Sequence, residues 1–305
     1  MNFNLRGGVA VVTGAASGIG AALARGLAAK SCNLALADRD VAGLAKSAAA
    51  ARERGVKVSE HTLDVADANA IAALPDQVLA QHGRLNVLIN NAGVELGGTF
   101  AQTDLADFEW LMNINFYGVV RMTHAFLPFL QREQAAQIVN ISSVFGIIAP
   151  PEQTAYCASK FGVRGFSESL RHELLDSSIG VTVVHPGGVA TNIALNARNP
   201  KGLNSDEVER RRERARQMLT LSPDIAAATI IDGIERRAER VLIGSDAKRI
   251  ALIQRLFPVR YWRVIRRALP AEPAVEQAVS HGYHSRAHCI VPGKTPHPQQ
   301  AREHH

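Results

Sequence analysis

Tyr156 and Lys160 are one helical turn apart, and their side-chain types suit proton transfer. The surrounding stretch 154–175 has a helical pattern, so residues four apart share one face of the helix. A free phenol has a pKa near ~10 and is a poor proton acceptor at neutral pH, but a neighbouring ammonium favours the phenolate. A depression of ~3 units corresponds to about 4 kcal/mol of differential interaction. Tyr156 could then take a proton from a hydroxyl group or give one to a carbonyl oxygen.

Ser143 precedes Tyr156 by 13 residues and follows Ile138–Ile141, which has the pattern of a buried strand. Open parallel sheets place their binding sites at the carboxyl ends of the strands. A serine hydroxyl at that edge could donate a hydrogen bond to a substrate oxygen as negative charge develops on it. Taken singly, Tyr156 and Ser143 would be an ordinary surface tyrosine and a strand-end serine. Together with Lys160 they indicate an active site.

A glycine-rich loop, TGAASGIG, joins the apolar run Val9–Val12 to a helical pattern that begins near Gly18. Glycines allow a tight turn and a close backbone approach, so that a pyrophosphate can sit on the free N–H groups of the helix. The next apolar run ends at Asp38, 24 residues past Gly14, where a carboxylate can accept both ribose hydroxyls of an adenosine. A plain strand-to-helix turn is the alternative, but the context favours dinucleotide binding. The expected loop contacts are Gly14, Ser17, Gly18, Ile19 and Gly20.

Short aliphatic runs alternate with longer Ala- and Leu-rich stretches through residue 245. Several runs are apolar at every position, as is typical of strands covered on both faces. The expected strands are Val9–Val12, Asn33–Ala37, Lys57–Thr62, Val87–Ile89, Ile138–Ile141, Thr182–Val184 and Val241–Ile243. The expected helices lie at about 18–30, 41–54, 67–82, 104–131, 154–175 and 224–239. This alternation predicts an α/β fold, a Rossmann-type doubly wound parallel sheet of about seven strands with helices on both faces.

The glycine spacing, TGxxxGxG, resembles that of the short-chain dehydrogenase/reductase family, and further motifs follow in that family's order. They are Asp64-Val65, Asn90-Asn91-Ala92-Gly93, Asn115 in Asn-Phe-Tyr-Gly, Ser143 after Asn-Ile-Ser, Tyr156 to Lys160, and Pro186-Gly187-Gly188-Val189-Ala190-Thr191. The resemblance covers roughly residues 5–245. It implies a Rossmann-type domain, a nicotinamide cofactor, and hydride transfer to or from a carbonyl carbon by an enzyme acting on CH–OH groups.

The resemblance also implies roles for single residues. Lys160 would hydrogen-bond the nicotinamide ribose, and Asn115 would hold a water that links Lys160 to solvent. Asp64 would hold the adenine amino group beside the Val65 backbone, although Asp64 could instead cap a helix. The ribose side would be lined by Asn91, Ala92 and Gly93, and the nicotinamide carboxamide would meet Pro186, Gly187, Val189 and Thr191.

The choice of cofactor depends on Asp38 and its neighbours. A carboxylate at this position repels a 2′-phosphate, and Ser17 stands where phosphate-binding relatives often carry a base. These features favour NAD. Arg39 follows directly and could meet a 2′-phosphate if Asp38 turned away, so NADP is the alternative; otherwise Arg39 stacks on adenine or faces solvent.

The residues expected around the substrate pocket are mostly apolar, which suggests a lipophilic secondary alcohol or ketone that is steroid-, retinoid- or lipid-like. Glu95 would face solvent or touch the substrate. Alternatives are an NADP-dependent 3-oxoacyl-type ketoreductase and a non-catalytic dinucleotide-binding adaptor at a membrane surface. The pocket residues are Val94, Glu95, Leu96, Phe145, Ile147, Ile148, Pro150, Pro151, Gly188 and the insertion 193–221.

The net charge of +6 comes from one segment. Residues 246–269 hold seven bases and one acid, whereas residues 1–245 hold 24 of each sign, so the composition does not favour a nucleic-acid partner. After Pro258 the apolar residues recur at helical spacing beside a stripe of arginines. Such a basic amphipathic helix could lie on an anionic membrane, or it could simply pack on the body or on another subunit.

We therefore expect a catalytic domain at 1–245, with a helical insertion at 193–221 that Ser205 could cap, a basic helical extension at 246–269 and a loosely ordered tail at 270–305. Three dispersed cysteines give no disulfide framework, and no metal site is expected. Without a secretory signal or an apolar membrane span, a cytoplasmic enzyme is expected, with peripheral contact at the inner membrane surface as a further hypothesis. Relatives suggest a homodimer or homotetramer.

Overall fold

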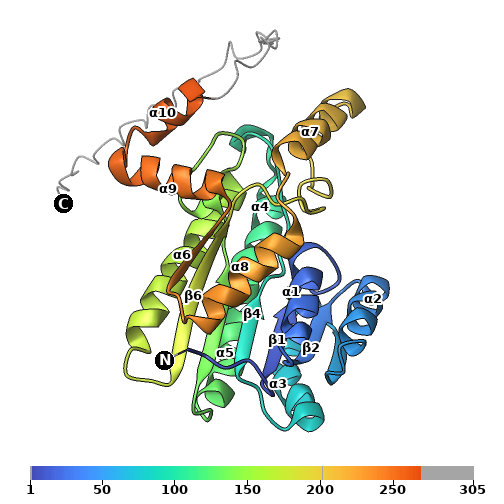
Figure 1. Ribbon diagram of the computed structural model, residues 1–305. Coiled ribbons are helices and arrows are strands. Elements are labelled where there is room, and N and C mark those ends of the chain that lie inside the picture. The colour runs from blue at the N-terminus through green and yellow to red at the C-terminus, as the bar shows by residue number, and fades with distance from the viewer. Residues whose placement is uncertain (1, 201, 269–305) are drawn as a thin grey trace, which may run out of the picture. The chain divides into compact units, whose positions relative to one another are not determined.

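Seven parallel strands form one sheet in the order β3-β2-β1-β4-β5-β6-β7 (Figure 1). The computed structural model describes residues 2–200 and 202–268. The strand order reverses between β1 and β4, and such a switch point is where open α/β sheets bind ligands. All seven predicted strands are present: β1 Val9–Thr13, β2 Asn33–Asp38, β3 Val58–Thr62, β4 Val87–Asn90, β5 Ala136–Ile141, β6 Ile179–Pro186 and β7 Arg240–Ile243.

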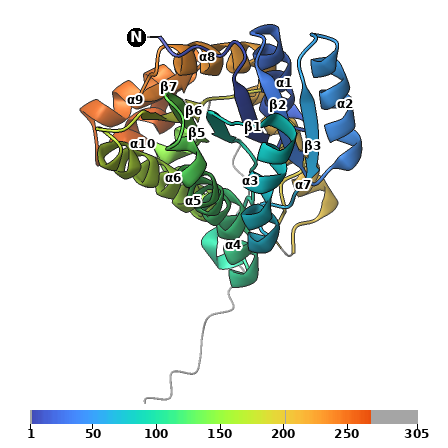
Figure 2. The same cartoon turned by 90° about the horizontal axis from the view of Figure 1, so that it is seen from below.

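Helices cover both faces of the sheet, as predicted. On β1, Ala10 and Val12 pack into one apolar core with α1 and α8, while Val9 and Val11 pack into a second core with α3 and α5. Figure 2 shows α1 and α8 on one side of the sheet, and α3, α5 and α6 on the other. The covering helices are α1 Gly18–Ala29, α2 Val41–Arg52, α3 Ala68–His82, α5 Gly118–Leu130, α6 Thr154–Glu173 and α8 Pro223–Glu235.

The expected helix at 104–131 differs from the structure. It is divided into α4 Leu105–Met112 and α5 by a π-helical turn, η2 Asn113–Tyr117. A π-helical turn holds an extra residue and re-aims the side chains it carries. Here it buries Asn115 completely, with its amide turned to the loop after β4.

The insertion at 193–221 contains one helix, α7 Ser205–Met218, none of whose side chains is buried. Its N-cap is Asn204 and not the predicted Ser205: the Asn204 side chain accepts from the Glu207 N–H at 2.9 Å, and Glu207 returns the bond. This reciprocal capping box leaves Ser205 as the first helical residue. An ion pair of 3.0 Å between Arg211 and Glu152 ties α7 to the loop before α6.

The basic extension folds as two helices, α9 Ser245–Leu256 and α10 Tyr261–Ala268. Residues 1–268 form one compact unit that includes both. Ile265 on α10 is buried against Ile147 and Ile148, and the Tyr261 hydroxyl accepts from the Ala149 N–H at 3.0 Å. The extension therefore packs on the body beside the expected pocket, while the tail predicted at 270–305 lies outside the described residues. Across the described residues, no helix combines the length and apolar character needed to cross a membrane.

Candidate active site

The glycine loop makes a tight turn between β1 and α1. Gly14 has φ +65° and Gly18 has φ +52°, a region that favours glycine. A Cβ on Gly14 would lie 2.8 Å from the Ala92 Cα, and one on Gly20 would overlap the Gly14 carbonyl oxygen. Ser17 is exposed, its side chain does not cap α1, and the first turn holds no acid. Ile19 is half-buried against the core. The N-terminus of α1 is thus free to bind an anion.

Hydrogen bonds of Thr13 and Asn91 connect this loop to the segment after β4. The Thr13 hydroxyl accepts from the backbone N–H groups of Asn91 (3.0 Å) and Ala92 (3.1 Å). The Asn91 side chain donates to the carbonyls of Thr13 (2.9 Å) and Gly14 (3.1 Å). The Asn91 amide is therefore committed to the loop itself, and Ala92 and Gly93 form the surface beyond it.

Asp38 lies at the end of β2 beside the same loop. Its carboxylate accepts from the Ala16 N–H at 2.9 Å and from the Asp40 N–H at 3.0 Å. Backbone donors thus fix the carboxylate next to the glycine turn, where a ribose would be recognised. Arg39 is exposed and has no ion pair among the described residues.

The adenine-side candidates differ in burial. Asp64 is exposed and accepts from the Ala66 N–H at 2.9 Å, whereas Asp67 caps α3. The helix-cap alternative for Asp64 is therefore wrong, and its second oxygen is free of the described hydrogen bonds. Val65 is 8% exposed and packs closely on Gly118. A Cβ added to this glycine would lie 3.2 Å from the Val65 side chain.

Tyr156 and Lys160 lie on the same face of α6, as their spacing predicts. The Lys160 ammonium is 5.6 Å from the centroid of the Tyr156 ring, and it donates to the Ile141 carbonyl at 3.1 Å. Both side chains are buried, at 8% and 3% exposure. No carboxylate of the described residues is bonded to the buried ammonium, and burial lowers the pKa of Lys160 to about 8.

The pKa of Tyr156 differs from the expected depression. Burial, followed by the charge of Glu95, raises the pKa of the phenol above its ordinary value, and a hydrogen bond from Ser143 opposes the rise. The expectation counted the neighbouring ammonium and left out desolvation, which dominates at this depth. In the protein by itself the phenol is therefore protonated at neutral pH.

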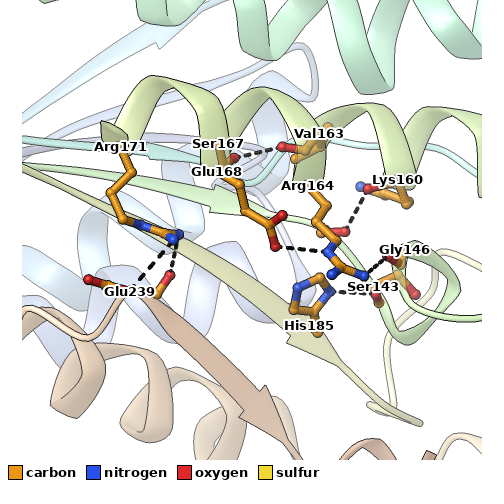
Figure 3. Close-up of polar contacts among 11 residues, drawn as sticks. Ser143, Gly146, Lys160, Val163, Arg164, Ser167, Glu168, Arg171, His185 and Glu239 are labelled. Carbon is orange, nitrogen blue, oxygen red and sulfur yellow. Dashed lines mark hydrogen bonds and ion pairs between the residues drawn. The ribbon is translucent and has the colours of Figure 1, made fainter. Parts of the chain in front are cut away.

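Ser143 lies just beyond the carboxyl end of β5, near enough to Tyr156 for its hydroxyl to lower the pKa of the phenol. The same hydroxyl accepts from the Phe145 N–H at 3.1 Å. From β6, His185 donates through Nδ1 to the Ser143 carbonyl at 2.8 Å, a contact drawn in Figure 3. His185 is fully buried, which lowers its pKa to about 4 and keeps the ring neutral. The sequence prediction did not include His185, whose signal was a histidine at the end of a mostly apolar strand, directly before Pro186-Gly187.

Asn115 lies near Lys160 and is bonded to the segment after β4. Its Oδ1 accepts from the Val94 N–H at 2.8 Å, and its Nδ2 donates to the Val94 carbonyl at 2.9 Å. A Cβ on Gly93 would lie 3.3 Å from Asn115 Oδ1 and 3.5 Å from Lys160 Nζ. The π-helical turn thus brings Asn115, Gly93 and Lys160 together.

The segment after β6 faces the glycine loop. A Cβ on Gly18 would lie 3.1 Å from the Thr191 side chain. Val189 is buried, and Gly187 N–H donates to the Ile243 carbonyl at 2.9 Å. Asp246, at the start of α9, accepts from the Gly188 N–H at 2.8 Å, so the extension supports this segment from behind. Sequence analysis did not single out Asp246 for this role.

The assembled site fits a dinucleotide. A glycine cradle that any Cβ would fill, an uncapped helix N-terminus, and a carboxylate at the end of β2 stand where pyrophosphate and adenosine ribose would bind. The predicted group Ser143, Tyr156 and Lys160 lies at the same edge. Glu95 is half-buried and accepts from Gln153 Nε2 at 3.2 Å, so its side chain is not simply in solvent.

This fold and this site define a Rossmann-type dinucleotide-dependent oxidoreductase. The profile described as short chain dehydrogenase matches residues 8–202, so the chain belongs to the short-chain dehydrogenase/reductase family and acts on CH–OH groups. It is 41% identical over 264 residues to the protein named SadH from Mycobacterium tuberculosis, covering 86% of this chain and 95% of SadH. It is 35% identical over 234 residues to dehydrogenase/reductase SDR family member 7B of Bos taurus, covering 75% of this chain and 72% of that protein.

Solved structures show the same fold. The short chain dehydrogenase/reductase from Burkholderia phymatum in complex with NAD is 30% identical, with a TM-score of 0.76, covering 89% of this chain and 99% of that one. A short-chain dehydrogenase from Streptomyces avermitilis is 29% identical, with a TM-score of 0.73, covering 87% and 99%.

Proposed function

We propose that this chain is an NAD-dependent oxidoreductase that interconverts a hydrophobic secondary alcohol and its ketone. The observation that carries the proposal is the Lys160 ammonium 5.6 Å from the centroid of the Tyr156 ring, with Ser143 near enough at the carboxyl edge of the sheet to lower the pKa of that phenol. Hydroxyl, phenol and ammonium at one edge form a proton-transfer group. The glycine loop next to them supplies the place for the cofactor.

In ketone reduction, Tyr156 donates its proton to the carbonyl oxygen, and Ser143 donates a hydrogen bond to the same oxygen as negative charge develops. The raised pKa of Tyr156 means that this proton is present at neutral pH. In alcohol oxidation the phenolate accepts the proton, and the Lys160 ammonium stabilises that negative charge. Asn115, bonded to Val94, holds the space beside Lys160 through which a water can relay the proton.

NAD is the proposed cofactor, with NADP as the alternative. When bound, it accepts or supplies the hydride and, in its oxidised form, adds positive charge near the phenol. Asp38 would accept hydrogen bonds from the ribose hydroxyls, and the free N–H groups of α1 would hold the pyrophosphate. The Burkholderia phymatum relative, solved in complex with NAD, supports this choice. The other proposed contacts are Arg39, Asp64, Val65, Asn91, Ala92, Gly93, Lys160, Pro186, Gly187, Val189 and Thr191.

The apolar surroundings support a lipophilic substrate. Leu96, Ala155 and Phe145 pack around Tyr156, and Ile147 and Ile148 continue the apolar surface towards α10. A steroid-, retinoid- or lipid-like alcohol fits such a lining better than a phosphorylated sugar does. We assign catalysis to residues 1–245 and a supporting role to the extension at 246–269.

The test is a panel of steroid, retinoid and fatty alcohols, together with 3-oxoacyl thioesters, incubated with NAD(H) or NADP(H). The absorbance of the reduced nicotinamide reports turnover. We expect turnover of hydrophobic secondary alcohols with NAD, and Asp38→Ala should reduce the preference for NAD over NADP at least tenfold. Turnover confined to 3-oxoacyl thioesters with NADPH would favour the ketoreductase alternative. Cofactor binding without turnover of any member would favour the non-catalytic adaptor.

We also propose that the α9–α10 pair contacts an anionic membrane surface. Four apolar side chains on it are exposed: Leu252 57%, Leu256 63%, Phe257 46% and Val259 89%. The bases around them are Lys248, Arg249, Arg255, Arg260, Arg263, Arg266 and Arg267. The one acid of the segment, Asp246, is turned inward to Gly188. Apolar side chains within an unbalanced positive field match anionic headgroups, whereas a second copy of the same face would be repelled.

This contact would make the chain a cytoplasmic enzyme that binds the membrane peripherally. Co-sedimentation with phosphatidylcholine vesicles, with and without phosphatidylserine, tests it. Truncation at Gly244 is unsuitable because it removes Asp246. Leu256→Ser with Phe257→Ser should reduce binding to anionic vesicles at least fivefold. The matched control, Phe100→Ser with Leu105→Ser, removes two exposed apolar side chains elsewhere (66% and 69% exposed) and should bind like the wild type. Equal partitioning of all three proteins would overturn the contact.

A homodimer or homotetramer through α5 and α6 is proposed by analogy with the family. Tyr117 and Phe161 are exposed at 50% and 38% beside these helices, which suits an interface. Light scattering after size exclusion should give a dimer or tetramer that Phe161→Arg weakens. A monomeric wild type would contradict the assembly.

A further inference from the structure

Glu95 is an acidic side chain in the mostly apolar wall beside Tyr156. The backbone N–H of Arg198 donates to the Glu95 carbonyl at 3.0 Å and so fixes the Glu95 backbone. The next residue, Leu96, is 2% exposed and packs in one cluster with Ala155 and Tyr156. The position of Glu95 is therefore set by the same packing that sets the phenol, and its charge acts on that phenol.

Gln153 places a second acceptor beside this carboxylate. It occupies the N-cap position of α6, three residues before Tyr156, without a side-chain capping bond, and its Nε2 donates to Glu95 Oε1 at 3.2 Å. Its Oε1 is buried and has no hydrogen-bond partner in the part of the chain that the structure describes. A buried acceptor without a donor costs about 1–3 kcal/mol, so a ligand that supplies the donor gains that free energy.

The arginines near this pair are engaged elsewhere. Arg198 stacks on the Trp110 ring at 3.6 Å and pairs with Asp107 at 2.8 Å, and Arg211 pairs with Glu152 at 3.0 Å. Within residues 2–200 and 202–268, Gln153 is the one hydrogen-bond donor to the Glu95 side chain. Burial raises the pKa of Glu95, as expected for a carboxylate without a base.

We propose that Glu95 and Gln153 form a polar subsite that binds a hydrogen-bond donor on the substrate, a second hydroxyl or an ammonium group, close to the reacting carbon. Both unpaired groups are acceptors, so they select donors and reject carbonyl or carboxylate groups. This inference rests on the proposed function, because the subsite is defined relative to the alcohol that Tyr156 would contact.

The experiment compares kcat/KM for 2-octanol with that for its 1,2- and 1,3-diols and the corresponding amino alcohols, all oxidised with NAD. For the wild type, we expect at least one donor-bearing analogue to exceed 2-octanol about tenfold. Glu95→Leu and Gln153→Leu should bring that ratio close to one. Glu95→Gln separates the two donors: a hydroxyl-selective subsite keeps part of the preference, whereas an ammonium-selective subsite loses it. Glu109→Leu, which removes an exposed carboxylate on α4, should leave the ratio unchanged.

The outcomes separate the subsite from the function on which it rests. If 2-octanol is oxidised but the wild-type ratio is near one, or if Glu95→Leu and Gln153→Leu both keep the wild-type ratio, the subsite is wrong and the proposed function stands. If neither these alcohols nor any alcohol of the steroid, retinoid and fatty-alcohol panel is oxidised, both are contradicted. NADH binding and the melting temperature of each variant identify any that fails to fold, and the remaining variant then decides.

Discussion

Asp246, at the start of α9, accepts a hydrogen bond of 2.8 Å from the Gly188 N–H, and so couples the C-terminal extension to the segment that follows β6. Added Cβ atoms on Gly187, Gly188 and Gly244 would all approach this carboxylate, so the three glycines make room for it. The extension therefore supports the region where the nicotinamide would bind, in addition to carrying the basic surface.

Asp246→Ala should weaken cofactor binding. Losing the acceptor leaves the Gly188 N–H without this partner, and a hydrogen bond to a charged group contributes about 1.5–3 kcal/mol to stability, so the Kd for NADH should rise by up to roughly 100-fold. Fluorescence titration with NADH measures the change. Asp232→Ala, on α8, is the control, because it removes an exposed carboxylate whose ion-pair partner is Arg236 on the same helix. Equal Kd values for both variants would contradict a positioning role.

His185→Phe should destabilise the fold and disturb Ser143. The ring is buried and its Nδ1 donates to the Ser143 carbonyl, so an apolar ring leaves that carbonyl with the Gly146 N–H at 2.9 Å as its remaining donor, at a cost of about 0.5–1.5 kcal/mol. We expect a several-fold fall in kcat with little change in KM for NAD. Unaltered kcat at a reduced melting temperature would limit His185 to a structural role.

The same histidine predicts an acid limit to stability. Its folded pKa of about 4 lies below the ordinary 6.5, so the folded state binds fewer protons between those values. Stability from this group is complete above pH 6.5 and is lost as the pH falls towards 4, by about 3 kcal/mol in all. Urea unfolding at pH 7 and pH 4.5 measures it. In His185→Phe the slope between these values should shrink; an unchanged slope would assign the acid sensitivity to other groups.

Lys160→Met should abolish turnover and yet stabilise the protein. The folded pKa of about 8 lies below the ordinary 10.5. At pH values below 8 the buried ammonium therefore lowers the free energy of unfolding by about 3 kcal/mol. The substitution also removes the hydrogen bond to the Ile141 carbonyl, which costs about 1 kcal/mol and offsets part of this gain in stability. The variant should therefore unfold at higher urea at pH 7, with an advantage that fades between pH 8 and 10.5. A less stable variant at pH 7 would contradict the desolvation argument.

Much of the fold follows from local sequence patterns. Apolar runs such as Val9–Val12 mark strands covered on both sides, and the glycine loop and the Tyr156–Lys160 spacing bring their residues together whatever the rest of the chain does. Contacts between distant segments could not be predicted in this way. Asp246 on Gly188 and His185 on Ser143 depend on how α9 and β6 pack, which no local period records.

Two differences between the sequence prediction and the structure arise from tertiary packing. The helical period over 104–131 does not show the extra residue of the π-helical turn, which becomes evident once Asn115 pairs with Val94. The direction of the Tyr156 pKa shift depends on burial, and spacing alone gives only the neighbouring charge. Both features concern the candidate site, where local rules are most often overridden.

Tyr156→Phe tests the central claim most directly, because it removes one oxygen and leaves the ring packed against Phe145 and Leu96. NADH should bind with a Kd within about threefold of the wild type, whereas turnover of the best alcohol in the panel should fall at least a thousandfold, consistent with a general acid–base contribution of ~10²–10⁴. Ser143→Ala should show a smaller loss with the same cofactor affinity. Turnover at the wild-type rate in Tyr156→Phe would contradict the assignment of Tyr156 as the proton-transfer residue.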